Sequence, residues 1–498
     1  MIRARRVTSA ALWDAACALA AFTVPAAVYI ASASHEPASW DTAELQGVPY
    51  ILGIAHPTGF PLYVLVGYVW SHAVALGSVA FRMNAMSGVA IAVACLAAYQ
   101  VARLLGAARS IALLATLWFA FTQNVWAHGA RAEAQNLAVA CEAVAIYAFL
   151  RCLRAGGDRW YLAAFALCGL ALAAHPNALW LLPAFAVGSA IAVRRPSLRI
   201  CGLAAAVVIA GLAFYLYLPL RSAYVAAHGL DPAASLPGAG GGIFWNYNDP
   251  RTLSGLTVEL TGAQFQTPSY FAAAFNPLHA GDAIWAFING THEQFGTLAT
   301  LLLFAGLVTA WRRDWRATLV LCIACTLGLF FSVVYPNEGD VGRYRILASW
   351  LAVPLLGALS FDDGTPRLRT LALRALLAIF LAAGAATAFF NQRGFFSHEP
   401  GEGGRWVISA VRSAVPPGSV IVTGWLDATS LAYGAYVDGS LPGRVVVSDN
   451  ELRVDLYRQW AAKRRVFVLA DPHSAGDLAG ARRYATLDNY HELFSVTP

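Results

Sequence analysis

Long runs of apolar residues recur from residue 11 to residue 390, and short polar or basic segments separate them. Each run is about 17 to 23 residues long, the length that an α-helix needs to cross a bilayer. The pattern predicts an α-helical polytopic membrane protein with about eleven transmembrane helices. The predicted spans are 11–32, 84–105, 110–127, 134–152, 160–175, 177–193, 200–219, 294–311, 317–335, 344–361 and 368–390.

One further apolar stretch, 60–79, is predicted to lie along the outer membrane surface, or to dip into the membrane and return. If it does not cross, the arginine clusters between later spans fall on the same side as the N-terminal MIRARR. The positive-inside rule favours this arrangement. It makes the N-terminus cytoplasmic and gathers the long polar loops and the C-terminus on the other face. The clusters are Arg103/Arg109, Arg151/Arg154/Arg159, Arg194/Arg195/Arg199, Arg312/Arg313/Arg316 and Arg367/Arg369.

Composition agrees with a membrane protein, because 58% of the residues are apolar and only 12% are charged. A soluble globular protein has about 25% charged residues. The net charge of +6 does not indicate nucleic acid, since the basic residues are almost all arginines in short clusters between apolar runs. The eight cysteines lie within or at the edges of apolar runs, so neither a disulfide framework nor a zinc site is predicted.

The chain changes character after residue 390. Short β-branched runs at 419–424, 444–449 and 465–471 alternate with amphipathic stretches such as 450–462. This alternation predicts a small α/β domain with a parallel sheet. Since no GxGxxG follows the first run, no nucleotide site is assigned to it. The predicted organisation is a transmembrane domain, 1–390, and an extracytoplasmic α/β domain, 391–498.

The first outer loop carries two acids, Asp41 and Glu44, whose spacing places them on one face of a helix. A carboxylate beside a membrane span can be partly desolvated, which makes it a better base. Both could also be ordinary solvated loop acids. The turn-rich segment that follows, with His56 and Pro57, is either a site element or a simple entry into the next apolar stretch.

A second group of polar residues follows the third span. Arg131 and Glu133 form either a surface ion pair or part of a site in which Glu133 faces Asp41. Trp126 is predicted to be an interfacial anchor. Glu142 lies inside the next span, where it either serves function or bonds a neighbouring helix.

Three arginines are predicted on the outer face: Arg221, Arg343 and Arg345. Guanidinium groups bind phosphate through a planar fork of donors, so an anionic ligand is one explanation for them. The alternative is pairing of the last two with Glu338 and Asp340.

Together these residues resemble the GT-C superfamily of integral-membrane glycosyltransferases, which use polyprenyl-phosphate-linked sugars. DTAEL (41–45) and AHPTGFPLY (55–63) look like the O-mannosyltransferase subfamily of the vertebrate plexin-domain enzyme and its bacterial relatives. Later motifs follow in the expected order, and the resemblance covers about residues 10–360. They are the segment from Trp126 to Glu133, LALAAHPN (170–177), YLYLPLRS (215–222) and NYNDPRTL (246–253).

The resemblance implies that Asp41 is the general base or positions the acceptor, and that Glu44, His56 and Glu133 match further motif positions. HPTG replaces the commoner HPPG, and the AQ after Glu133 departs from the usual pattern. We expect catalysis by Asp41, Glu44 and Glu133. The predicted substrate-binding residues are His56, Arg131, Arg221, Arg343 and Arg345.

The predicted reaction moves a sugar, mannose by resemblance, from a polyprenyl-phosphate donor to an acceptor hydroxyl at the outer face of the inner membrane. The acceptor is predicted to be protein serine or threonine. A lipid such as lipid A, or a cell-wall glycan, fits the sequence equally well. A transporter and a passive scaffold are rival hypotheses. The chemistry requires no metal ion, although Asp41 and Glu44 could hold a divalent cation.

Overall fold

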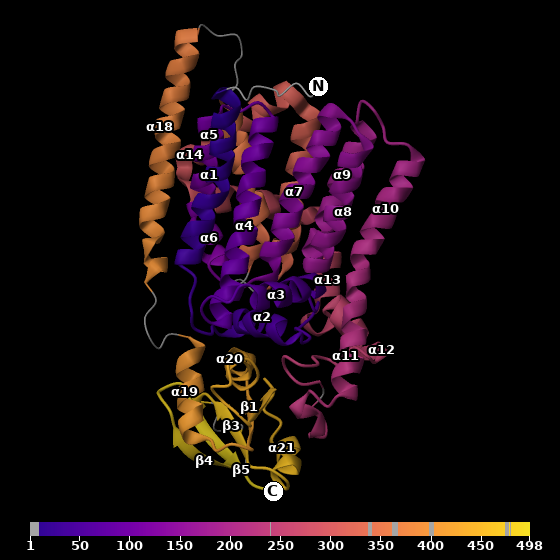
Figure 1. Ribbon diagram of the computed structural model, residues 1–498, viewed down its shortest axis with the longest axis vertical. Coiled ribbons are helices and arrows are strands. Elements are labelled where there is room, and N and C mark those ends of the chain that lie inside the picture. The colour runs from indigo at the N-terminus through magenta and orange to yellow at the C-terminus, as the bar shows by residue number, and fades with distance from the viewer. Residues whose placement is uncertain are drawn as a thin grey trace, which may run out of the picture.

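The computed structural model describes residues 9–239, 241–336, 341–360, 367–397, 403–473, 478 and 480–498. Figure 1 shows a tall helical bundle with a small α/β domain against one of its ends. The helices of the first half are α1 (Ser9–Ala31), α2 (Trp40–Ile51), α3 (Pro61–Ala73), α4 (Val79–Leu104), α5 (Arg109–Phe121), α6 (Gln123–Gly129), α7 (Ala134–Ala155), α8 (Asp158–Ala174), η1 (Pro176–Trp180), α9 (Leu181–Ile191), α10 (Leu198–Leu212), η2 (Ala213–Leu216) and α11 (Tyr217–Ala227).

The second half of the bundle contains several short helices and two long ones. Its elements are η3 (Pro232–Ser235), α12 (Leu253–Thr261), η4 (Ala263–Phe265), α13 (Thr267–Ala274), η5 (Pro277–His279), α14 (Ala280–Thr326), α15 (Gly328–Val334), η6 (Val341–Arg345), α16 (Ile346–Trp350), α17 (Ala352–Ala358), α18 (Arg367–Gln392) and η7 (Arg393–Phe396).

The predicted multi-span architecture is confirmed, but not the exact number of spans. Among the described residues, 6 helices are long and apolar enough to cross a membrane, or 7 if α5 and α6, bent by 70°, count as one. The predicted span 294–311, and 317–335 except for its last residue, fall within the apolar stretch Pro277–Val334. Asp314 has non-helical dihedral angles inside α14, and its carboxylate accepts a hydrogen bond from the Ala317 amide, which caps the second segment.

Helices α2 and α3 lie at the end of the bundle that faces the α/β domain (Figure 1). Helix α3 has 13 residues and is not among the candidate spans of the described chain, in agreement with the prediction for 60–79. Trp126 is fully buried and donates its indole N–H to the Ser32 hydroxyl, 2.8 Å away. It is therefore a core residue, and its predicted role as an interfacial anchor is wrong.

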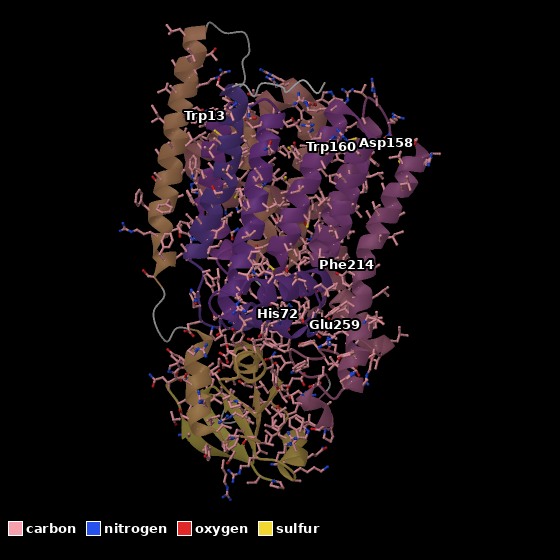
Figure 2. The ribbon with its side chains drawn as sticks, in the orientation of Figure 1. Trp13, His72, Asp158, Trp160, Phe214 and Glu259 are labelled. Atoms are coloured by element: carbon pink, nitrogen blue, oxygen red, sulfur yellow. The ribbon has the colours of Figure 1, made fainter. Side chains whose placement is uncertain are left out.

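The two ends of the bundle differ in charge. Figure 2 labels Trp13, Asp158 and Trp160 at the end far from the α/β domain, and His72 and Glu259 near that domain. The far end carries the turns with the arginine clusters. There Arg103 lies 2.8 Å from Asp14, and Arg154 lies 3.5 Å from Asp314.

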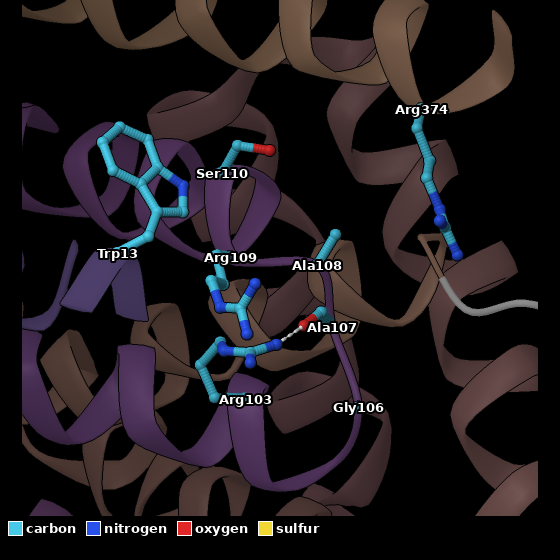
Figure 3. A pocket seen from close by; sticks show the side chains of 8 residues that line it. All are labelled: Trp13, Arg103, Gly106, Ala107, Ala108, Arg109, Ser110 and Arg374. Atoms are coloured by element: carbon cyan, nitrogen blue, oxygen red, sulfur yellow. Dashed lines mark hydrogen bonds between the residues drawn. The ribbon is translucent and has the colours of Figure 1, made fainter. Parts of the chain in front are cut away.

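A pocket of about 370 Å³ lies at this basic end (Figure 3). Arg103, Arg109 and Arg374 are among its lining residues, and Arg103 donates a hydrogen bond to the Ala107 carbonyl. The pocket is remote from the acids of the first loop, so it is not the candidate active site.

The C-terminal domain is an α/β unit with a five-stranded sheet. Its strands are ordered β2-β1-β3-β5-β4, and β1 pairs in parallel with β2 and β3. This confirms the three predicted strands, whereas the antiparallel β4 and β5 were not predicted. The elements are α19 (Gly404–Ala414), β1 (Val420–Thr423), α20 (Trp425–Tyr436), β2 (Val445–Ser448), α21 (Val454–Ala461), β3 (Val466–Ala470), β4 (Ala481–Thr486) and β5 (Glu492–Val496).

The α/β domain packs directly on helix α2. Leu45 and Val48 of α2 share a buried hydrophobic cluster with Val407 of α19 and Leu431 of α20. Burial of apolar surface is the main favourable contribution to such packing. The C-terminal domain therefore touches the helix that carries Asp41 and Glu44.

Candidate active site

Asp41 lies in the first turn of α2, one helical turn before Glu44, as their spacing predicted. Its carboxylate accepts a hydrogen bond from the Arg343 guanidinium at 3.2 Å and another from the Trp425 indole N–H at 2.8 Å. The His56 ring nitrogen lies 3.8 Å away. One quarter of the Asp41 side chain, 25%, stays exposed, so the carboxylate is held by three partners yet accessible.

Glu44 is fully buried and acts on His56. Its carboxylate accepts hydrogen bonds from the His56 backbone amide at 2.8 Å and from the His56 ring. A buried carboxylate with two such bonds fixes the orientation of the imidazole. The predicted pair of acids therefore divides into Asp41, which is accessible, and Glu44, which holds His56 in place.

Glu133 precedes α7 and is buried beside two arginines. Its carboxylate lies 3.2 Å from Arg343 and 2.9 Å from Arg131. Arg343 therefore bridges Asp41 and Glu133, which are far apart in the sequence. Two carboxylates joined through a buried guanidinium keep both charges compensated at low dielectric constant. The acids that the sequence placed in one site do lie together.

Neighbouring positive charges lower the pKa values of Asp41 and Glu133. Burial would raise the pKa of Asp41, but the charges of His56 and Arg343 and the hydrogen bond from Trp425 hold it below its usual value. Burial would likewise raise the pKa of Glu133, but the charges of Arg343 and Arg131 lower it strongly. Both acids are therefore carboxylates at neutral pH.

Glu44 and His56 behave differently. Burial raises the pKa of Glu44 despite the neighbouring His56. Burial alone would lower the pKa of His56, but the charges of Glu44 and Asp41 raise it from 6.5 to about 9. At neutral pH the His56 ring is therefore protonated, and it is hydrogen-bonded to Glu44.

The predicted arginines take different positions. Arg131 exposes 40% of its side chain, although its guanidinium pairs with Glu133. Arg221 donates to the carbonyls of Leu52, at 2.5 Å, and Ile51, at 3.2 Å, at the end of α2. Arg345 is half-buried on η6 beside Arg343, and its Nε makes no hydrogen bond within the described residues. The predicted alternative partners Glu338 and Asp340 lie outside those residues.

Two site residues were missed by sequence reasoning. Trp425 opens α20, directly after β1, and its position at the carboxyl end of a predicted parallel strand was an available signal. Glu259 of α12 is fully buried near His56. Its Oε1 accepts a bond from Asn248 at 3.1 Å, and its Oε2 makes none within the part of the chain that the structure describes. No pattern in the surrounding sequence distinguished it.

Glu142 lies apart from these groups. It is buried in α7 and lines a small pocket with Asn177, Trp180 and Tyr344. A search of the described residues finds no group of three or more His, Cys, Asp or Glu side chains arranged to hold a metal ion.

Comparison with known proteins places this geometry in context. Residues 41–197 match the family model described as the Protein O-mannosyl-transferase TMEM260 N-terminal domain. The chain is 26% identical over 327 residues to Protein O-mannosyl-transferase TMEM260 of Mus musculus, covering 63% of this chain and 44% of the mouse protein. It is 28% identical over 120 residues to the protein of that name from Dictyostelium discoideum, covering 24% of this chain and 15% of the relative. The chain thus spans less than half the length of these curated relatives.

Solved structures extend the similarity to the whole fold. ArnT from Cupriavidus metallidurans superposes with a TM-score of 0.57 at 12% identity, covering 99% of this chain and 100% of ArnT. The oligosaccharyltransferase AglB from Archaeoglobus fulgidus gives a TM-score of 0.53 at 11% identity, covering 95% of this chain and 71% of AglB. At such low identity the likeness shows the fold alone. The chain has the GT-C fold, and its sequence is similar to the TMEM260 protein O-mannosyltransferases.

Proposed function

We propose that this protein transfers mannose from a polyprenyl-phosphate donor to an acceptor hydroxyl on protein serine or threonine. The observation that carries the proposal is an accessible Asp41 carboxylate, held by Arg343, His56 and Trp425 at one end of the bundle. The named activity of the mouse relative supports the sugar and acceptor. ArnT has been solved bound to undecaprenyl phosphate, and AglB in complex with an inhibitory peptide and a dolichol phosphate, which supports the lipid carrier.

The reaction is a direct displacement at the anomeric carbon. Asp41 accepts the proton of the acceptor hydroxyl as its oxygen attacks that carbon. The bond from the carbon to the phosphate oxygen breaks, and polyprenyl phosphate leaves with the bonding electrons. The anomeric centre is inverted. The transition state is oxocarbenium-like, as in glycosidases, so a nearby carboxylate also stabilises its positive charge.

The other charged residues have separate tasks. Arg343 fixes Asp41 and Glu133 relative to each other. Glu44 fixes His56, whose protonated ring faces Asp41. Arg131, with 40% of its side chain exposed, offers donors to the departing phosphate, and we assign Arg345 to the same anion.

The site is proposed to face the outside of the inner membrane. It lies at the end of the bundle opposite the arginine-rich turns (Figure 2). Basic loops are retained on the cytoplasmic side. The donor then enters from the bilayer and the acceptor from the extracytoplasmic space.

The test is sugar transfer by the purified full-length chain in lipid nanodiscs. Polyprenyl-phosphate mannose carrying an isotope label is supplied together with proteins and lipids extracted from the host cell envelope, and mass spectrometry identifies what gains a hexose. Labelled peptides support the proposal. A labelled lipid or glycan would replace the acceptor, and no transfer from any polyprenyl-phosphate hexose would refute the function. Asp41→Asn provides the inactive control.

A further inference from the structure

The first residue of α20 reaches out of the C-terminal domain into the candidate active site. We infer that Trp425 is a positioning residue for Asp41, so that the α/β domain is part of the catalytic unit. The inference rests on the proposed function. It assigns a role to a domain whose contribution neither the sequence nor the comparisons define.

Two donors from different parts of the chain hold the Asp41 carboxylate in place. Arg343 donates to Oδ2 at 3.2 Å, and the Trp425 indole donates to Oδ1 at 2.8 Å. With one donor on each oxygen, the plane of the carboxylate is fixed. Each oxygen keeps a second lone pair for the acceptor proton.

The indole is itself held by ring contacts. Its centroid lies 5.7 Å from that of His56 and 5.6 Å from that of Tyr247, with both rings nearly perpendicular to it. Such edge-to-face pairs prefer defined geometries. The Trp425 backbone amide donates to the Asn450 side chain at 2.9 Å, which caps the start of α20.

The rest of α20 and α19 is attached to the segment around Asp41. Ser430 donates to the Ala38 carbonyl at 2.8 Å. The Gly404 amide donates to the Pro37 carbonyl at 3.0 Å. These bonds lie just before Asp41 in the sequence, so displacement of the domain would move both Trp425 and the backbone that carries the acid.

The experiment compares Trp425→Phe and Trp425→Ala with a matched control, Trp406→Phe, in the full-length chain. Phenylalanine keeps an aromatic ring but lacks the N–H donor. Trp406 belongs to the same domain and packs on His491, away from Asp41. Transfer from labelled polyprenyl-phosphate mannose, thermal unfolding and the pH dependence of kcat are measured for each variant.

A hydrogen bond to a charged group corresponds to roughly a tenfold to hundredfold effect. We expect Trp425→Phe to lower kcat by about tenfold with little change in KM for the donor. Trp425→Ala should lower kcat further, because alanine also removes the ring contacts. Since the indole stabilises the ionised carboxylate, its loss raises the pKa of Asp41 and moves the acid limb of the profile to higher pH.

Other charged and titratable groups surround Asp41, and all remain in every variant. They are His56 and Glu44 of the first loop and helix, Glu133 before α7, Arg343, Tyr344 and Tyr335 around η6, and Tyr247 of the loop before α12. The difference between Trp425→Phe and Trp406→Phe therefore isolates the indole donor.

A measurement without turnover separates this inference from the proposed function. Carbodiimide reacts with protonated carboxyl groups, and mass spectrometry of the peptide containing Asp41 reports its titration. We expect half-maximal labelling at higher pH in Trp425→Phe than in wild type or Trp406→Phe. A wild-type protein that transfers no sugar would refute the function, while the labelling still tests the contact. Unchanged labelling and unchanged kcat in Trp425→Phe, or a faster variant, would overturn the inference.

Discussion

Arg343 determines the electrostatics of the site at the residue scale. Its buried guanidinium lies 3.2 Å from both Asp41 and Glu133. Removing one partner of a buried ion pair leaves an uncompensated charge, and here two carboxylates would lose their shared cation. The sequence prediction that Arg343 holds the donor phosphate stays a prediction. The structure adds that this arginine has two protein carboxylates as partners.

Asp41 is the residue whose replacement should affect chemistry most. Asparagine is nearly isosteric, but it cannot accept a proton at neutral pH. Asp41→Asn should lower kcat by about 10²–10⁴, the usual contribution of a positioned general base. Activity per folded molecule is the quantity to measure, with binding of undecaprenyl phosphate as a second readout.

The control is Asp438→Asn. Asp438 lies outside the candidate active site, and its carboxylate is 2.9 Å from the Arg405 guanidinium. This variant should retain the wild-type rate. If Asp41→Asn also keeps most of that rate, Asp41 is not the base and Glu133 becomes the candidate.

His56 gives the site a dependence of stability on pH. Its pKa is raised from 6.5 to about 9, so its contribution to stability is fully present below pH 6.5 and is lost as the pH rises through 9. The wild-type chain should exceed His56→Gln in free energy of unfolding by on the order of 3 kcal/mol at low pH. Thermal unfolding at intervals from pH 6 to 10 measures this difference.

The matched substitution His228→Gln removes an exposed imidazole that stacks on Tyr224. It should leave the melting temperature close to wild type throughout the range, as most surface substitutions do. A wild-type advantage over His56→Gln that stays constant up to pH 10 would contradict the raised pKa.

Elements were predictable where periodicity alone decides them. The spacing of Asp41 and Glu44 predicted one face of a helix, and α2 supplies it. The β-branched runs predicted β1, β2 and β3. Strand β4 was not predicted, because its sequence ARRYAT is polar and largely exposed and therefore lacks an apolar pattern.

The partners within the site were harder to predict, because they depend on tertiary contacts. Nothing local to Arg343 indicates that it reaches Asp41, and nothing local to Asp41 indicates an indole from the C-terminal domain. The number of spans was not confirmed, for a related reason. Short helices such as α16 and α17 interrupt apolar runs that read as continuous in the sequence.

The contact of α19 with the first loop is tight enough to test. A Cβ added at Gly404 would lie 2.5 Å from the Ala38 carbonyl oxygen, which is closer than van der Waals contact permits. Gly404→Ala should therefore destabilise domain docking by about 1–3 kcal/mol, the usual cost of overpacking. The melting temperature and kcat should both fall, because docking places Trp425 against Asp41.

Gly202→Ala is the matched control. Gly202 lies in α10, and a Cβ there would meet nothing within 4 Å. Alanine in a helix interior is favoured over glycine by about 1 kcal/mol, so this variant should be as stable as wild type or more so. Equal behaviour of the two alanine variants would show that Gly404 is not packed against the first loop.

At the scale of the whole molecule, charge separates the two ends of the bundle. The turns that carry Arg103 and Arg154 lie at the end far from the α/β domain (Figure 1), and the acids of the site lie near that domain. Since basic loops stay on the cytoplasmic side, one orientation follows for the entire chain. We therefore predict that the site and the C-terminal domain are both extracytoplasmic.

This orientation predicts which positions a membrane-impermeant thiol reagent can reach in intact cells. Ser413 is exposed on α19, and Ser197 is exposed in the turn before α10. Ser413→Cys should react with the reagent, whereas Ser197→Cys should react only after the membrane is permeabilised. The eight native cysteines are buried or half-buried, so the parent chain measures the background. Labelling of Ser197→Cys but not Ser413→Cys in intact cells would invert the topology and place Asp41 in the cytoplasm.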